Sequence, residues 1–182
     1  MMNKQHGAAL IVSLVILIVM TIIGLSAIRT SVMEEKMAAN ARDQQIALQA
    51  TEMALRAGEA WIAAQTTEPD VTDNGSSNIW TANIMSTDDD VADSWWHQRN
   101  QAWWDANGVQ ANSDVTFSSN EAEIAVNRPR YIIEYQQYVG DDLLIGTGST
   151  TTGRSFYRIT ARGTGASEQA RVMLQSTTAK RY

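Results

Sequence analysis

The sequence predicts an α+β protein in which one long N-terminal helix packs on a small antiparallel β-sheet head. An uncharged apolar run near the N-terminus is followed by a helical pattern that meets no proline before Pro69. Further along the chain, three segments change to the alternation of period two that is typical of strands. With 182 residues, the chain has room for one small globular domain beyond the helix.

The first element is an apolar segment close to the N-terminus. Residues 1–7 form a short polar stretch with Lys4, whereas residues 8–28 contain no charge. A run of about 20 apolar residues is long enough to cross a bilayer as one helix. A secretory signal peptide has a shorter apolar core with its cleavage site after it, but here the small-residue break, Gly7, precedes the run. A cut after Gly7 would therefore leave the apolar helix on the mature chain.

Residues 29–65 continue the helical pattern as an amphipathic segment rich in helix-forming residues. A continuous helix over residues 8–65 would be about 85 Å long, its first half in lipid and its second half on the head. The alternative is an ordinary signal anchor whose helix ends near Arg29. Apolar residues at spacings of three and four mark the face expected to pack on the head: Ile46, Ala50, Met53, Ala57, Trp61 and Ala64, widened by Ala47, Ala54 and Ile62.

Residues 66–182 are expected to form the head. Residues 66–78 contain proline, an Asn-Gly pair and polar residues, which predicts a loop. Acids and hydroxyls from Ser86 onward predict a helix start, and this helix would end at Asn107-Gly108. Three strands joined by turn-rich connectors predict an antiparallel meander: residues 131–139, 155–161 and 170–177.

The composition excludes several classes of function. A net charge of −6 disfavours nucleic-acid binding. The absence of cysteine removes thiol chemistry, and only His6 and His97 could act as imidazole bases. No nucleophile motif accompanies them, so we expect neither an enzyme nor a cofactor.

Two acidic segments resemble cation sites in part. Residues 70–75 (DVTDNG) match the opening of a calcium loop, but its twelfth position is Thr81 in place of the required glutamate. A plain turn explains them better. Residues 88–90 with Asp93 could hold a cation, but capping of the predicted helix explains the same acids more simply. We therefore expect no metal site.

Four of the six tryptophans fall in the predicted head helix. Trp96 and Trp103 are seven residues apart and share a helix face, with Trp95 and Trp104 on either side of it. These rings could cover the sheet as core residues. They could also form a partner surface, because adjacent rings cannot both point inward and tryptophan is frequent at binding hot spots.

The N-terminal block GAALIVSLVILIVMTIIGLSAIRTSVMEEKMAANARDQQIALQATEMALRAGEAW resembles the start of the PilX-type minor pilins of the type IV pilus system, and YRITARGTG…RVMLQST resembles their end. The resemblance implies a type IV pilin-like fold, cleavage after Gly7 by the membrane prepilin peptidase and N-methylation of Ala8. It also implies a complex with other minor pilins that primes assembly of the major pilin and is carried to the pilus tip. There the complex can present a PilY-type adhesin.

One position departs from the pilin pattern. Most pilins carry glutamate at the fifth position after the cleavage site, and this chain has Val12 there. An ionised carboxylate in lipid is costly unless it is paired. In pilins its implied partner is the amino terminus of a neighbouring subunit, which a subunit at the tip would not have above it. The tip pseudopilin of type II secretion, the GspK type, also lacks this glutamate, but it carries a large extra domain.

The sequence thus predicts a PilX-like minor pilin that primes pilus assembly. It would first be anchored in the inner membrane with its N-terminus in the cytoplasm and would then lie at the pilus tip. Lys4 and Arg29 nearly balance, so this orientation depends on the length of chain to be exported. A pilus-tip adhesive or ligand-binding module and a GspK-like pseudopilin are the alternatives.

Overall fold

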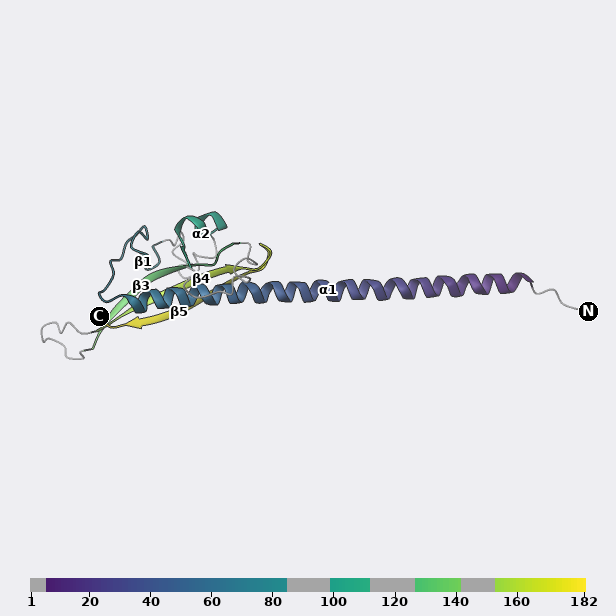
Figure 1. Ribbon diagram of the computed structural model, residues 1–182, viewed down its shortest axis with the longest axis horizontal. Helices are drawn as coiled ribbons and strands as arrows, with labels where there is room; N and C mark the ends of the chain where they lie inside the picture. Colours follow the sequence, from purple (N-terminus) through teal and green to yellow (C-terminus); the bar gives the residue numbers. More distant parts are fainter. Residues whose placement is uncertain (1–5, 85–98, 112–126, 142–152) are drawn as a thin grey trace, which may run out of the picture. The chain divides into compact units, whose positions relative to one another are not determined.

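The computed structural model describes residues 6–84, 99–111, 127–141 and 153–182. Its chain forms two compact units, Met1–Arg42 and Asp43–Tyr182. The first unit is helical wherever it is described, because it is the N-terminal part of α1 (His6–Ala64). Figure 1 shows α1 as one unbroken helix, as the sequence predicts.

The second unit contains a mixed sheet of five strands: β1 (Ile79–Thr81), β2 (Val109–Gln110), β3 (Arg130–Gly140), β4 (Gly153–Thr164) and β5 (Arg171–Lys180). β3, β4 and β5 form the predicted antiparallel meander. β1 pairs in parallel with one edge of β3, and β2 adds an antiparallel pair to β3. The sequence analysis missed both short strands. The α+β architecture is otherwise the predicted one.

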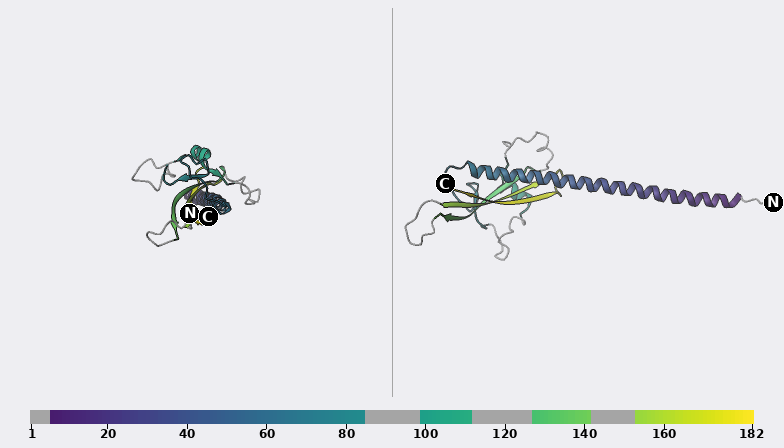
Figure 2. Two further views of the ribbon diagram at one scale, coloured as in Figure 1. Left: turned by 90° about the vertical axis from the view of Figure 1, so that its left-hand side faces the viewer. Right: turned by 90° about the horizontal axis from the view of Figure 1, so that it is seen from below.

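Each face of the sheet carries its own hydrophobic cluster. On one face Tyr131, Ile133, Tyr157 and Ile159 pack with residues of α1. On the opposite face Ile132 packs with Trp80 and Trp104, the latter from α2 (Gln101–Asn107). This alternation follows from the period-two geometry of the strands. The sheet therefore separates α2 from the part of α1 that belongs to the second unit (Figures 1 and 2).

The buried stripe of α1 overlaps the predicted one. Its centre is formed by small residues and one isoleucine: Ala47, Thr51, Ala54, Gly58 and Ile62. Of the predicted central residues, Ala50 is buried but Ala64 is exposed. The prediction is confirmed for Ala47, Ala50, Ala54 and Ile62 and wrong for Ala64. It omitted Thr51 and Gly58 because they do not count as apolar, although their small size lets the helix approach the sheet closely. A Cβ atom at Gly58 would lie 2.8 Å from Cγ2 of Ile159.

The predicted start of the tryptophan-bearing helix was also wrong within the described residues. α2 begins only at Gln101, because the side chain of Asn100 accepts a hydrogen bond from the main-chain nitrogen of Trp103 at 2.9 Å. Such a contact is a typical helix N-cap. Residues 86–98 of the predicted helix lie outside the described residues. The predicted end is confirmed, with Gly108 as the C-cap.

Four polar contacts join α1 to β5 and to the turn before it. Asp43 accepts hydrogen bonds from the main chain and hydroxyl of Ser167. The hydroxyl of Thr51 donates to the Val172 carbonyl at 3.2 Å. The hydroxyl of Ser176 donates to the carboxylate of Glu59 at 2.8 Å, and the ammonium of Lys180 donates to carbonyl groups at the end of the helix. β5 therefore holds this part of α1 along its length.

Candidate functional site

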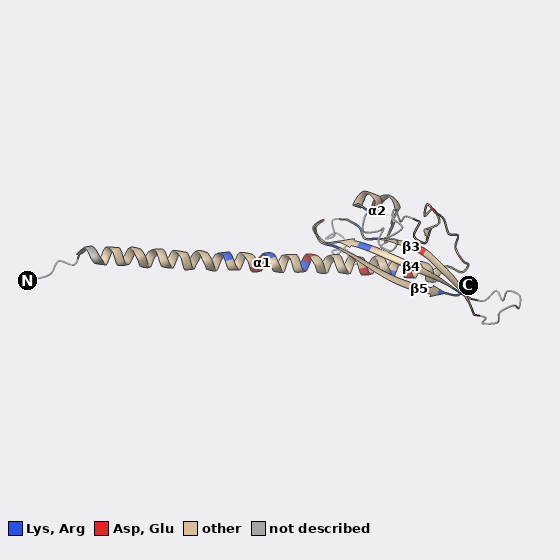
Figure 3. Cartoon of the chain, turned by 180° about the vertical axis from the view of Figure 1, so that it is seen from behind, with Lys and Arg blue, Asp and Glu red and all other residues tan. Residues whose placement is uncertain are grey.

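The N-terminal part of α1 carries the predicted processing and membrane residues. Gly7 and Ala8 lie in the first turn of the helix. The sequence has no aspartate, glutamate, lysine or arginine between Lys4 and Arg29, and Figure 3 shows the described part of α1 in this apolar stretch without such residues. Among the described residues, α1 is the one helix long and apolar enough to cross a membrane. Val12 lies in this apolar stretch with 57% of its surface exposed.

Hydroxyl groups within the apolar stretch are satisfied by the helix itself. The side chain of Ser13 donates to the Leu10 carbonyl at 2.9 Å, and Thr21 donates to the Ile18 carbonyl at 2.7 Å. Ser26 makes the same kind of bond within the helix at 2.9 Å. A lipid environment offers no water to pair with such groups, so internal pairing removes most of the penalty of placing them there.

Trp80, Trp103 and Trp104 form a cluster on the α2 face of the sheet. Trp104 is 1% exposed, whereas Trp103 is half-buried. The Trp103 ring lies 5.7 Å from that of Trp104 and 6.2 Å from that of Trp80. Trp95 and Trp96 lie outside the described residues, so the proposed partner surface formed by the four tryptophans stays a prediction.

A buried ion pair lies on the α2 face of the sheet. Nε of Arg158 donates to Glu134 at 2.9 Å, and Nη2 donates to the second carboxylate oxygen at 3.1 Å. Glu134 is 1% exposed. Asn83 completes the arrangement by donating its main-chain N–H to this carboxylate at 3.3 Å. A bidentate pair of this kind fixes the register of two strands.

The acidic loop over residues 70–75 forms a turn. Asp73 accepts a hydrogen bond from Thr81 at 2.6 Å, and Asn74 accepts one from the main chain of Ser76 at 3.1 Å. Gly75 has a φ of +67° and packs directly on the Trp80 ring. Within the described parts of the chain, no three acidic or histidine side chains come together as a metal site. Residues 88–90, Asp93 and His97 lie outside those parts.

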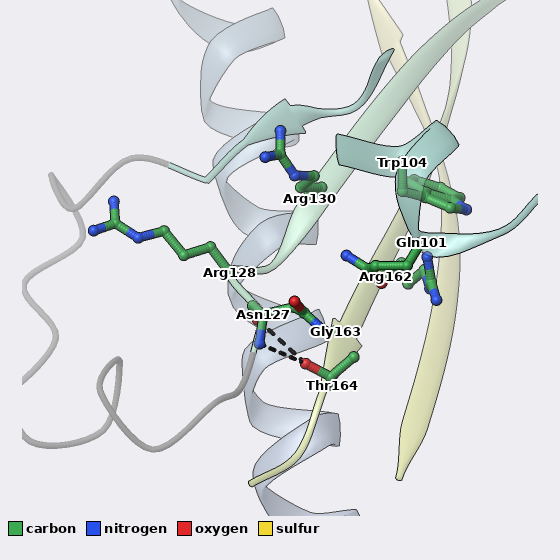
Figure 4. Close-up of a pocket in the computed structure, with 8 residues that line it drawn as sticks. All are labelled: Gln101, Trp104, Asn127, Arg128, Arg130, Arg162, Gly163 and Thr164. Atoms are coloured by element: carbon green, nitrogen blue, oxygen red, sulfur yellow. Dashed lines mark hydrogen bonds between the residues drawn. The ribbon is translucent and has the colours of Figure 1, made fainter. Parts of the chain in front are cut away.

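A pocket lies between α2 and the start of β3. Its outer part has a volume of about 190 Å³, and a small recess adjoins it. Gln101, Asn127, Arg162 and Thr164 line both parts. Thr164 and Asn127 bond each other at 3.2 Å, which closes one side of the recess (Figure 4). The guanidinium of Arg162 lies over the Trp104 ring at 5.8 Å.

The comparisons with known protein families decide the identity of the chain. The model of the PilX N-terminal domain matches residues 6–56, and the model of the C-terminal domain of type IV pilus assembly protein PilX matches residues 61–180. The chain belongs to the PilX family of type IV pilus minor pilins. Comparisons with curated proteins and with solved structures gave no match.

Membership of the PilX family gives the N-terminal helix its meaning. The family consists of structural components of the pilus, and the apolar part of α1 fits the membrane anchor of a pilin. The family also implies contact with other components of the type IV pilus.

The sequence analysis of this PilX-family chain missed Arg162. The residue precedes Gly163 near the end of β4 and is only 7% exposed. The sequence feature that could have indicated Arg162 is its position four residues after Arg158 in the same strand. This spacing puts both arginines on the same face of the sheet. An arginine on a face that is largely covered needs a local reason, because such residues are seldom buried unless paired.

Proposed function

We propose that this PilX-family chain is a minor pilin that primes type IV pilus assembly and lies at the pilus tip. The supporting observation is the combination of a full-length family match with Val12 at the fifth position after the expected cleavage site. A glutamate at this position would lack its partner in a subunit that has no neighbour above it, and its carboxylate would then be unpaired in lipid. A valine avoids this unpaired charge.

The proposed mechanism has three steps. The prepilin peptidase cleaves after Gly7 in the inner membrane, and Ala8 becomes the methylated N-terminus. The apolar helix then packs against the helices of other minor pilins, helped by small residues such as Gly24 and Ser26. The head then contacts neighbouring heads, for which the exposed end of β3 at Tyr138 is available.

In this proposal the protein acts through assembly and without catalysis. Its partners are the other minor pilins, the major pilin below them and a PilY-type adhesin presented at the tip. The inner membrane holds the subunit before assembly, and the extracellular pilus tip holds it afterwards. An adhesive role carried by the tryptophans has less support, because Trp80 and Trp104 are buried in the head.

The test of priming is a clean chromosomal deletion complemented with wild type or single variants. We expect sharply fewer surface pili with an unchanged amount of major pilin in the cell. Complementation with Val12→Leu should restore pili, whereas Val12→Glu should restore fewer because its carboxylate lacks a partner. Normal piliation in the deletion strain would refute the priming role.

Processing and location need separate measurements. Mass spectrometry of the purified protein should give a chain that begins at methylated Ala8, and an intact Met1 would contradict the prepilin interpretation. Immunogold labelling should mark one end of each pilus. Labelling spread along the shaft would exclude a role confined to the tip.

A further inference from the structure

The pocket beside α2 contains a cation, Arg162, that has no counter-ion among the residues that the structure describes. Only 7% of the surface of Arg162 is exposed, and its Nη1 atom has no hydrogen-bond partner among the described residues. A buried donor left unpaired is costly, and a buried charge left unpaired is more so. The Trp104 ring under the guanidinium supplies an attractive contact but accepts no strong hydrogen bond.

The neighbouring charges do not compensate Arg162. Burial lowers the pKa of its guanidinium, and the positive charge of Arg171 on β5 lowers that pKa further, while Asp105 acts in the opposite direction. Asp105 is itself bound to Arg130 at 3.0 Å. Arg162 and Arg171 thus lie near each other although the net charge of the chain is −6. Two neighbouring positive charges are the arrangement expected around an anion.

The other basic groups near the recess are engaged or point elsewhere. Arg130 donates to Asp105 and, at 2.8 Å, to the Gly108 carbonyl. Arg128 is exposed, and Figure 4 shows its side chain and that of Arg130 directed away from Arg162. Arg162 and Arg171 are therefore the cations that the pocket can offer to a ligand.

The rest of the lining indicates which anion fits. The hydroxyl of Thr164 already donates to the Asn127 carbonyl, so the available donors are the side-chain amides of Gln101, Asn127 and Gln169. These groups can donate to the second oxygen of a carboxylate that is paired with a guanidinium. Glu168 also lines the pocket, so a dianion such as phosphate would meet more repulsion than a single carboxylate. The volume of about 190 Å³ admits an acidic side chain or the end of a polypeptide.

We propose that the Arg162 pocket binds a carboxylate group presented by a neighbouring protein subunit of the pilus. The inference deepens the proposed function, because it needs the assembly of pilins to supply the partner. It names the contact by which the α2 side of the head recognises that neighbour. The carboxylate comes from a glutamate or aspartate side chain or from a chain terminus.

The test uses the full-length protein in micelles of a neutral detergent. The probes are two blocked tripeptides, Ac-Gly-Glu-Gly-NH₂ and Ac-Gly-Gln-Gly-NH₂, together with Ac-Gly-Gly-Gly-OH and inorganic phosphate. Binding is followed by the side-chain NMR signals of ¹⁵N-labelled arginine at constant ionic strength. We expect the glutamate peptide or the peptide with a free terminus to shift the Arg162 signal, and the glutamine peptide to leave it unchanged.

Three arginine variants separate the pocket from general charge. Arg162→Gln and Arg171→Gln should each weaken carboxylate binding by roughly tenfold or more. Arg154→Gln removes an exposed arginine from the other end of β4 and should leave the affinity unchanged. If Arg162→Gln lowers the melting temperature enough to obscure the result, Arg171→Gln decides, because Arg171 is exposed.

Several results would overturn the proposal. Equal binding of the glutamate and glutamine peptides, an equal loss in Arg154→Gln, or tighter binding of phosphate than of every peptide would each do so. Larger shifts for the glutamate peptide than for Ac-Gly-Gly-Gly-OH would assign the carboxylate to a side chain, and the reverse would assign it to a terminus. Peptide binding with normal piliation in the deletion strain would refute the priming role alone, and lost pili without peptide binding would refute the pocket alone.

Discussion

Nζ of Lys180 lies 2.7 Å from the main-chain oxygen of Ile62. The same ammonium donates to the carbonyl of Ala63 at 2.7 Å and to that of Gln65. The last carbonyl groups of a helix have no partner within it, and a cation there also meets the negative end of the helix dipole. Because α1 has no basic residue in its own last turn, β5 supplies the cap that the helix lacks.

Removing this cap should destabilise the head. In Lys180→Met the aliphatic stem remains but the charge and its hydrogen bonds are lost, so we expect a decrease of about 1–2 kcal/mol in the free energy of unfolding. Denaturant unfolding of the full chain in detergent measures it. The control is Arg181→Gln, which breaks a partly exposed ion pair with Asp141 and should change stability by about 0–1 kcal/mol. Equal decreases in the free energy of unfolding would show that the Lys180 cap stabilises the head no more than a partly exposed ion pair does.

Replacing Gly58 should have the opposite effect to the one that helix propensity predicts. In an exposed helix, glycine to alanine stabilises by up to about 1 kcal/mol. Here the new Cβ would lie 2.8 Å from Cγ2 of Ile159 and 3.0 Å from Cδ2 of Tyr131, so we expect Gly58→Ala to destabilise by about 1–3 kcal/mol. The measurement is thermal unfolding of the full chain, in which the melting temperature of Gly58→Ala is compared with that of the wild type.

The matched control is Gly24→Ala in the same helix. Apart from the neighbouring backbone of its own helix, no described atom lies within 4 Å of the position that its Cβ would take, so this substitution should be neutral or slightly stabilising. If both alanine variants raise the melting temperature, the close packing of α1 on the sheet at Gly58 is wrong.

The ion pair of Arg158 and Glu134 should be strongly coupled. Arg158→Met removes one partner and leaves a carboxylate that is 1% exposed, which is expected to cost about 3–5 kcal/mol. The double variant Arg158→Met with Glu134→Leu removes both charges and should recover much of this loss. Urea unfolding of both single variants and the double variant gives the coupling energy. Additive losses would mean that the two side chains do not depend on each other.

Alkaline pH should unfold the head through its buried tyrosines. Burial raises the pKa of Tyr157, and also those of Tyr131 and Tyr182. The unfolded chain releases these protons near pH about 10, whereas the folded chain retains them. The contribution to stability is therefore complete below pH about 10 and is lost as the pH rises above it. Ultraviolet absorbance of tyrosinate and circular dichroism should change together in this range.

Tyr157→Phe tests which tyrosine governs this transition. Oη of Tyr157 is buried near Tyr182 and Ser155, and phenylalanine keeps the ring in place while it removes the group that ionises. We expect the variant to unfold at a higher pH than the wild type. An unchanged midpoint would assign the transition to other tyrosines.

Some elements were predictable because their signals are local. The apolar run without charge predicted the first part of α1, since a helix long enough to cross a bilayer needs little more than composition. β3, β4 and β5 were predictable because they are long and because their residues alternate between the two faces of the sheet. The N-cap of α2 was not recognised, although Asn100 carries the appropriate side chain for it.

Other elements depend on partners far along the chain. β1 and β2 have three and two residues, so no periodicity can be read from them, and they exist because the edge of β3 offers free hydrogen-bonding groups. The buried stripe of α1 was predicted only in part for a similar reason. Thr51 and Gly58 look unfavourable in a helix core until the strands opposite them are known.

By itself, the sequence determined the long helix, its apolar first part with Gly7, Ala8 and Val12, and the three-stranded meander. These features follow from composition and period, which act over a few neighbouring residues. The tertiary structure alone decided that Gly58 contacts Ile159, that Lys180 caps α1 and that Arg162 lies in a pocket with no counter-ion from the described parts of the chain. Such contacts join residues about a hundred positions apart, and burial and unpaired charge arise only when the chain brings them together.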